Sequence, residues 1–386
     1  MNRIGTMLIP LALVAGTTLS AQATVKIGVL APLSGDAASD GASVKNSVTL
    51  AVNHINAAGG VLGKKVELVI YDDAADPKQA TALARKLIEQ DQIKGLVAGS
   101  YSMPTRAIAP LFQDEKIPLV AAYAVHPDIT AGGKNSFCFR NGFLGVVEGK
   151  AAAYASVKML KGKKIAVLTS DNDFGRTMAE GFKQFMASPE AKGAQVISYQ
   201  TYPMSEKDYK PYLSKIKDSN PDVIFSAGYY FQTGPMVKQA REMGINAKFM
   251  GEEGADSPEF ISIAGKKDAE GFALVTNLNR DDPRPVVKNF LKEYQAQFHT
   301  SPDMVGAGAY DAFMILCDGM KRANSLDGSA VQKAISSMQN YNGLTGVIHS
   351  FNKGGVVKEF QVQVVKNGEF HKLGVITDPA IITPQQ

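Results

Sequence analysis

The strongest constraint on the fold of this chain is a repeated alternation of short β-rich runs and amphipathic stretches. The run 25–31 (VKIGVLA) precedes a stretch over 41–58 in which apolar residues recur at helical spacing, and the pattern repeats to about residue 122. Strands and helices that alternate in this way form a parallel sheet with helices on both faces. A second series of the same kind follows Gly145 and ends near Gly251. The sequence therefore predicts an α/β protein with two doubly wound units.

The C-terminal third of the chain cannot complete a sheet on its own. Its expected elements are helices at about 284–299, 303–323 and 328–337, then strand-like runs near 346–351, 358–365 and 370–376. We expect these elements to be shared between the two units, so that the chain crosses from one to the other more than once.

The N-terminus has the order of a secretory signal peptide. Arg3 supplies a positive start, and the apolar stretch 7–15 is shorter than the roughly 20 residues that span a bilayer. Ala21–Ala23 is a small-residue cleavage site. An apolar first helix is the alternative, which the three parts in this order disfavour. We expect residues 1–23 to be removed and a soluble mature chain to start at Thr24 in the periplasm, without a lipid anchor.

Composition and motifs argue against several classes of protein. The 41 basic and 37 acidic residues leave a net charge of +4, with no basic run suited to nucleic acid. The sequence lacks a P-loop, a dinucleotide fingerprint and a nucleophile elbow, and its five histidines have no metal-ligand spacing. We therefore expect no enzyme activity, no cofactor and no metal. Cys138 and Cys317 could form a disulfide in an oxidising compartment or remain buried free thiols, which we favour.

The loops that follow the predicted strands are the places to look for ligand contacts. Loop 99–105 leads into a helix, and its hydroxyls and free N–H groups suit a carboxylate, although Ser102 could simply cap that helix. Glu253 could neutralise an ammonium group or be an ordinary solvated acid. Phe174 and Tyr229 could be walls of a site or members of the core.

Several phrases of the sequence together resemble a known family. INAAGGVLGKKVEL, YDDAADPKQA, ITAGG, DFGRTMAEGF and FMGEEG occur in the order typical of the periplasmic leucine/isoleucine/valine-binding proteins. These are the ligand receptors of branched-chain amino acid ABC importers, and the resemblance covers about residues 24–380. It implies two lobes joined by three hinge strands in the type I periplasmic-binding-protein fold. It also implies a ligand cleft that closes by hinge motion, and delivery of the ligand to a permease in the inner membrane.

The resemblance also implies lobe boundaries. After the signal peptide 1–23, lobe 1 takes residues 24–144 and 278–352, and lobe 2 takes 145–277 and 353–386. Nothing in the sequence demands an oligomer, so we expect a monomer.

The resemblance assigns a role to six residues of the cleft. Ser102 and the Val125 N–H would hold the ligand carboxylate, and Glu253, Tyr229 and the Tyr123 carbonyl would hold the ammonium. Phe174 would cover the ligand side chain. The six predicted ligand-binding residues are therefore Ser102, Tyr123, Val125, Phe174, Tyr229 and Glu253.

This sequence departs from the family pattern at several positions. Val125 stands where threonine is usual, and Phe174 where tyrosine is common. Ala75 and Tyr101 occupy the positions of a small disulfide, and an aromatic of the first loop is replaced by Asp40 or a neighbour. The expected ligand is a branched-chain or other apolar amino acid. An amide, urea or aromatic carboxylate remains an alternative, as does a ligand-sensing module for a separate signalling partner.

Overall fold

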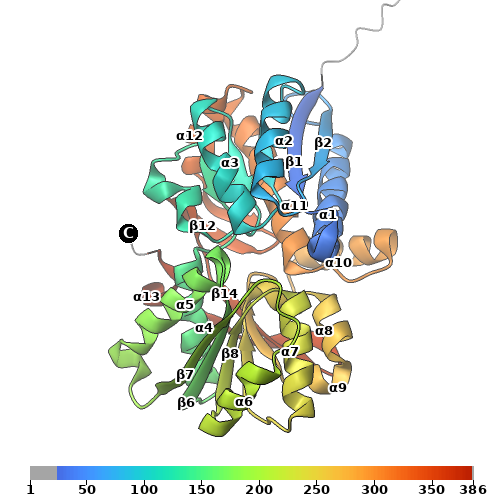
Figure 1. Cartoon of the computed structure of the whole chain (residues 1–386). Coiled ribbons are helices and arrows are strands. Elements are labelled where there is room, and N and C mark those ends of the chain that lie inside the picture. The colour runs from blue at the N-terminus through green and yellow to red at the C-terminus, as the bar shows by residue number, and fades with distance from the viewer. Residues whose placement is uncertain (1–23, 385–386) are drawn as a thin grey trace, which may run out of the picture.

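The computed structural model describes residues 24–384 and has two stacked lobes, each built around a parallel sheet (Figure 1). The predicted signal peptide lies outside the described residues. The first lobe has a five-stranded sheet in the order β2-β1-β3-β4-β5, with every pairing parallel. Its strands are β1 (Val25–Ala31), β2 (Val66–Asp72), β3 (Leu96–Ala98), β4 (Leu119–Ala121) and β5 (Cys138–Arg140), and its first helices are α1 (Ala38–Ala57), α2 (Pro77–Glu89) and α3 (Ser102–Asp114).

The second lobe has a seven-stranded sheet in the order β15-β14-β10-β9-β8-β6-β7. The strands β6 (Lys164–Ser170), β7 (Gln195–Tyr202), β8 (Val223–Ala227), β9 (Lys248–Gly251) and β10 (Ala273–Thr276) run parallel, whereas β14 (Phe360–Lys366) and β15 (Glu369–Ile376) are antiparallel additions. Its helices are α4 (Gly145–Tyr154), α5 (Asp173–Met186), α6 (Lys210–Ser219), α7 (Tyr230–Glu242), α8 (Pro258–Ala264), α9 (Lys266–Ala269) and α13 (Pro379–Ile382).

The C-terminal third is divided between the lobes, as the sequence predicted. The elements α10 (Pro285–Phe298), α11 (Met304–Ala323) and α12 (Gly328–Ser336) return to the first lobe, where α11 packs against α1 and β4. A small sheet follows, made of β11 (Gln339–Gly343), β12 (Gly346–Asn352) and β13 (Gly355–Val357). The chain thus crosses between the lobes after β5, after β10 and between β13 and β14. The α/β class, the doubly wound sheets and the three crossings are confirmed, while the residue-by-residue lobe boundaries stay a prediction.

Local sequence signals explain where the helices that reach the cleft begin. Asn172 caps α5 by accepting the Gly175 N–H, and Asp303 caps α11 by accepting the Gly306 N–H. Because α3, α5 and α7 follow the carboxyl ends of parallel strands, their N-termini converge on the space between the lobes. The start of α11, which follows α10, also lines this space.

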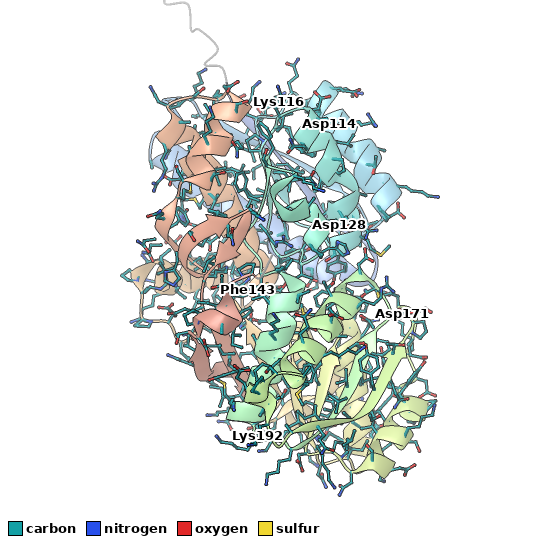
Figure 2. All side chains as sticks on the ribbon, turned by 90° about the vertical axis from the view of Figure 1, so that its left-hand side faces the viewer. Asp114, Lys116, Asp128, Phe143, Asp171 and Lys192 are labelled. Atoms are coloured by element: carbon teal, nitrogen blue, oxygen red, sulfur yellow. The ribbon has the colours of Figure 1, made fainter. Side chains whose placement is uncertain are left out.

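The waist between the lobes is packed with aromatic side chains. Phe143 lies in the first crossing, and Figure 2 labels it at the junction of the two lobes. Its ring stacks on that of Phe360, at the start of β14, with centroids 3.6 Å apart. The core is therefore continuous across two of the crossings.

Both cysteines are buried and free, so the structure has the buried-thiol arrangement. Burial raises the pKa of each thiol to about 12, which keeps both protonated and unreactive at neutral pH. Among residues 24–384, we find no helix with the length and apolar character needed to cross a bilayer.

Candidate functional site

A narrow cavity lies between the lobes and is lined from both sides, and the space in it that the centre of a water molecule can reach is about 20 Å³. Residues from the first lobe come from α1, α3, the loop after β4 and the start of α11. Residues from the second lobe come from the start of α5, the loop after β8 and the loop after β9. The cavity is lined by Asp40, Tyr101, Ser102, Tyr123, Ala124, Met304 and Val305 from the first lobe, and by Phe174, Tyr229, Glu253 and Gly254 from the second.

The structure brings together the six residues predicted from the sequence. Five of them line the cavity, and Val125 lies directly behind it, next to the lining residue Ala124. All six are buried. Their shared role in binding a ligand stays a prediction, because their positions show proximity and not occupancy.

Ser102 is placed to receive an anion. It is the first residue of α3, and its Oγ accepts the Val125 N–H at 3.2 Å. The N-cap of α3 is Tyr101, whose side chain makes no capping hydrogen bond, so Ser102 is not used as a conventional cap. The positive end of the α3 dipole and the Ser102 side chain therefore both lie at the cavity.

Three aromatic rings from the two lobes stack across the cleft. Tyr101 of the first lobe stacks on Tyr229 of the second with ring centroids 4.2 Å apart, and Phe174 stacks on the other side of Tyr229 at 5.0 Å. Tyr123 meets Tyr101 edge to face at 6.1 Å. These contacts join the lobes by an aromatic seal on the cavity wall.

Glu253 carries a buried acceptor that lacks a donor. Its side chain is 2% exposed, and among residues 24–384 no group donates a hydrogen bond to Oε2. Its backbone N–H donates to Oε1 of Glu148, which comes from α4, at 3.0 Å. Burial, reinforced by Glu252, raises the pKa of Glu253 well above its ordinary value, although Lys358 and Arg140 counteract this. A ligand ammonium in the cavity would supply both the missing donors and the missing positive charge.

A chain of ion pairs crosses the rim of the cleft outside the aromatic seal. Arg106 of α3 lies 3.0 Å from Asp173 of α5 and 3.9 Å from Asp128, and Arg176 bridges Asp173 and Asp171. Asp128 and Asp171 are labelled in Figure 2 on the facing edges of the upper and lower lobes. Of these pairs, Arg106–Asp173 is the one that joins the two lobes, and because Arg106 is exposed, this pair stabilises their contact by no more than about 1 kcal/mol.

The sequence reasoning did not assign two parts of the site. Met304 and Val305 line the cavity from the first turn of α11, and Glu148 supports Glu253 from behind. Asp303 is a typical N-cap residue, so the sequence could have located the start of this helix. That the start of α11 lies at the cleft depends on the return of the chain to the first lobe, which the sequence does not show. Glu148 sits in an apolar helical stretch, and nothing in the sequence marked it as a partner of Glu253.

The buried carboxyl groups predict how the stability of the unliganded protein depends on pH. Burial raises the pKa of Glu252 to about 8 and that of Asp303 to about 7, and it raises the pKa values of Glu148 and Glu253. A carboxyl whose pKa is raised on folding stabilises the fold fully below its unfolded value, near pH 4 to 4.5, and loses this contribution as the pH rises through the folded value. We therefore expect the melting temperature of the unliganded mature protein to fall between pH 5 and pH 8.

Scanning fluorimetry across that range would measure the effect. Glu148→Gln keeps an acceptor for the Glu253 N–H but cannot ionise, so its melting temperature should fall less steeply than that of the wild type. A melting temperature that rises steadily from pH 5 to pH 8 in the wild type would contradict this account of the buried acids.

Comparisons with known proteins agree with this architecture. The family model described as "Periplasmic binding protein" matches residues 24–369. A leucine-, isoleucine-, valine-, threonine- and alanine-binding protein of Pseudomonas aeruginosa is 30% identical over 90% of both chains. A Leu/Ile/Val-binding protein homolog of Brucella melitensis is 32% identical over 83% of this chain and 85% of its own length.

Solved structures show the same fold. A leucine-binding protein of Thermotoga maritima has a TM-score of 0.84 at 29% identity and covers 91% of this chain and 98% of its own. A solute-binding protein of Rhodopseudomonas palustris, solved with 3,4-dihydroxybenzoic acid, has a TM-score of 0.82 at 25% identity and covers 92% and 99%.

Proposed function

The chain belongs to the periplasmic-binding-protein family, and we propose from this premise that it is the ligand-binding subunit of an ABC importer for small α-amino acids. We propose that it is exported by its signal peptide, acts as a periplasmic monomer and passes its ligand to a permease in the inner membrane. Branched-chain and other apolar amino acids are the first candidates, since relatives that cover most of the chain are named for binding them. The similar proteins are binding proteins of transporters and not enzymes.

The observation that carries the proposal is the pairing of opposite recognition elements across one cavity. Ser102 at the N-terminus of α3 suits a carboxylate, and the undonated carboxylate of Glu253 suits an ammonium. These two groups belong to different lobes. An α-amino acid carries both complementary charges on adjacent atoms, so it would hold the lobes together by contacts that an open form cannot make.

This arrangement implies a mechanism of capture by hinge closure. A ligand first bound to one lobe gains its remaining contacts only when the lobes approach, so it shifts the equilibrium towards the closed form. Closure also removes water from the charged groups, which strengthens their hydrogen bonds. A permease that recognises the closed form would then be loaded only with occupied protein.

An aromatic carboxylate is the second candidate ligand. A flat ring could pack beside the aromatic cluster of Tyr101, Tyr229 and Phe174, and a relative of 25% identity was solved with a dihydroxybenzoate. Such a ligand offers no ammonium to Glu253, which is why we rank it second. The same ligand chemistry could also serve a sensing module for a separate signalling partner.

A thermal-shift panel on unfolded, ligand-stripped and refolded mature protein tests the proposal. The panel contains the L-amino acids, short amides, urea and benzoate-type acids. A ligand that binds only the folded state raises the melting temperature, by an amount that grows with its concentration relative to Kd. We expect α-amino acids to produce the largest shifts. Shifts with benzoates alone would overturn the amino-acid assignment, and uptake assays in cells lacking the protein would separate transport from sensing.

A further inference from the structure

A second buried carboxylate, Asp40, lines the same cavity and has a single side-chain partner. Asp40 lies in the first turn of α1 and is 4% exposed. The Tyr101 hydroxyl donates a hydrogen bond to its Oδ2 at 2.6 Å. Among residues 24–384, Asp40 forms no ion pair, and the charges that act on it are those of Asp303 and Glu259, which are both acids. Burial, with Asp303 and Glu259, raises the pKa of Asp40 well above its ordinary value, so the ionised form is costly unless a ligand supplies a further donor.

Asp40 is a carboxyl group on the cavity wall that the assigned head-group contacts do not use. The Tyr123 hydroxyl already donates to the Gly99 carbonyl, and the Tyr229 hydroxyl accepts from Asn172. Asp40 accepts its hydrogen bond from the hydroxyl at the tip of Tyr101. The length of the Tyr101 side chain therefore lies between Asp40 and the backbone that leads into Ser102, the residue at the start of α3 that suits the ligand carboxylate.

The backbone next to Asp40 packs closely against the loop that follows β1. At Gly41, a Cβ atom would lie 2.1 Å from the Pro32 carbonyl oxygen, so the loop after β1 packs directly on the first turn of α1. Tyr101 in turn is held by its stacking on Tyr229. The carboxylate and the hydroxyl thus form a preorganised pair, which recognises a ligand at a smaller entropic cost than mobile groups would.

We infer that Asp40, positioned by Tyr101, is a specificity-determining residue that selects α-amino acids whose side chain carries an N–H or O–H donor. A hydroxyl, a primary amide and an ammonium group share this chemistry. This inference rests on the proposed function, because it takes the head-group contacts as given, and it moves the preferred ligand from the apolar amino acids to those whose side chain carries a donor. An apolar ligand side chain would leave Asp40 buried without a second donor, and sites built to bind a polar group discriminate strongly against ligands that lack it.

Matched pairs of ligands test the inference. Threonine and valine have nearly the same shape, as do asparagine and leucine, and lysine provides the ammonium arm. Isothermal titration calorimetry on the stripped mature protein should give a Kd for threonine at least about tenfold below that for valine, or the corresponding preference for asparagine over leucine or for lysine. The preferred donor ligand then identifies which of the three chemistries Asp40 serves.

Variants separate this inference from the proposed function. Asp40→Leu should abolish or reverse the preference of the wild type for the donor ligand, and Asp40→Asn, which keeps the shape, should reduce it. Glu253→Gln should weaken both members of a pair and leave their ratio unchanged. Apolar ligands that match or exceed their donor partners in the wild type would overturn the role of Asp40 while leaving the proposed function intact. Absence of binding by every α-amino acid would overturn both.

Discussion

Replacing Glu253 by glutamine is expected to weaken the binding of every α-amino acid by about a hundredfold or more. The Glu253 carboxylate is 2% exposed, and its Oε2 has no donor within the described chain. A ligand ammonium would meet it inside a closed, narrow cavity. Removing one partner of a buried, hydrogen-bonded charge pair costs about 2–5 kcal/mol, which corresponds to a factor of roughly thirty to several thousand in Kd. Calorimetric titration with the tightest α-amino acid measures the change directly.

Two further measurements make the Glu253 result specific. Glu180→Gln is the matched control, since Glu180 is an exposed residue of α5 in the same lobe and its replacement should leave Kd unchanged. The melting temperature of unliganded Glu253→Gln should not fall, because the burial of this acid is unfavourable without a ligand. An affinity for α-amino acids equal to that of the wild type would remove Glu253 from the ammonium site.

The fold could be predicted from the sequence because its signals are local. The run VKIGVLA and the helical spacing that follows it are sufficient for a β-α unit, and the repetition of such units predicts a parallel sheet. The pairing of β14 and β15 as antiparallel additions to the second sheet was not predictable in this way. The pairing depends on where β14 enters the second lobe after the third crossing. Contacts between distant residues, such as the packing of Phe143 on Phe360, determine that position.

The site was predictable only in part, for a related reason. Ser102, Phe174 and Glu253 come shortly after the ends of strands, and the segments that follow strands at one edge of a parallel sheet converge whatever their sequence. The stacking of Tyr101 on Tyr229 and the support of Glu253 by Glu148 join residues more than a hundred positions apart in the chain. No periodicity or spacing encodes such contacts. The first joins the two lobes and the second joins α4 to the loop after β9 within the second lobe, so both depend on how distant elements pack.

Replacing Lys358 by methionine is expected to lower the stability of the protein by about 3–5 kcal/mol, the usual cost of removing one member of a buried charged network. Lys358 is fully buried in the third crossing, where its Nζ donates to Thr345 Oγ1 at 2.9 Å and lies 3.5 Å from Asn141 Oδ1. It also lies over the ring of Phe143.

The reason for the large effect is the set of acids around this lysine. Burial lowers the pKa of Lys358 to about 8, which still leaves it protonated at pH 7, while Asp311, Glu253 and Glu148 all favour its charged form. Asp311 itself accepts hydrogen bonds from the backbone of Leu344 and from Thr345, so it remains in place when the cation is removed. Methionine would leave these acids without their buried positive charge, and they would have to take up protons or destabilise the fold.

Thermal unfolding of the unliganded protein at pH 7 is the measurement, and a fall of about 5–10 °C in the melting temperature is expected. Lys366→Met is the matched control, because Lys366 is exposed at the end of β14 and its loss should change the melting temperature by no more than about 1 °C. A change in Lys358→Met as small as that of the control would mean that the desolvation of this lysine already cancels its attraction to the acids. The network at the third crossing would then contribute to the geometry of the hinge rather than to the stability of the closed form.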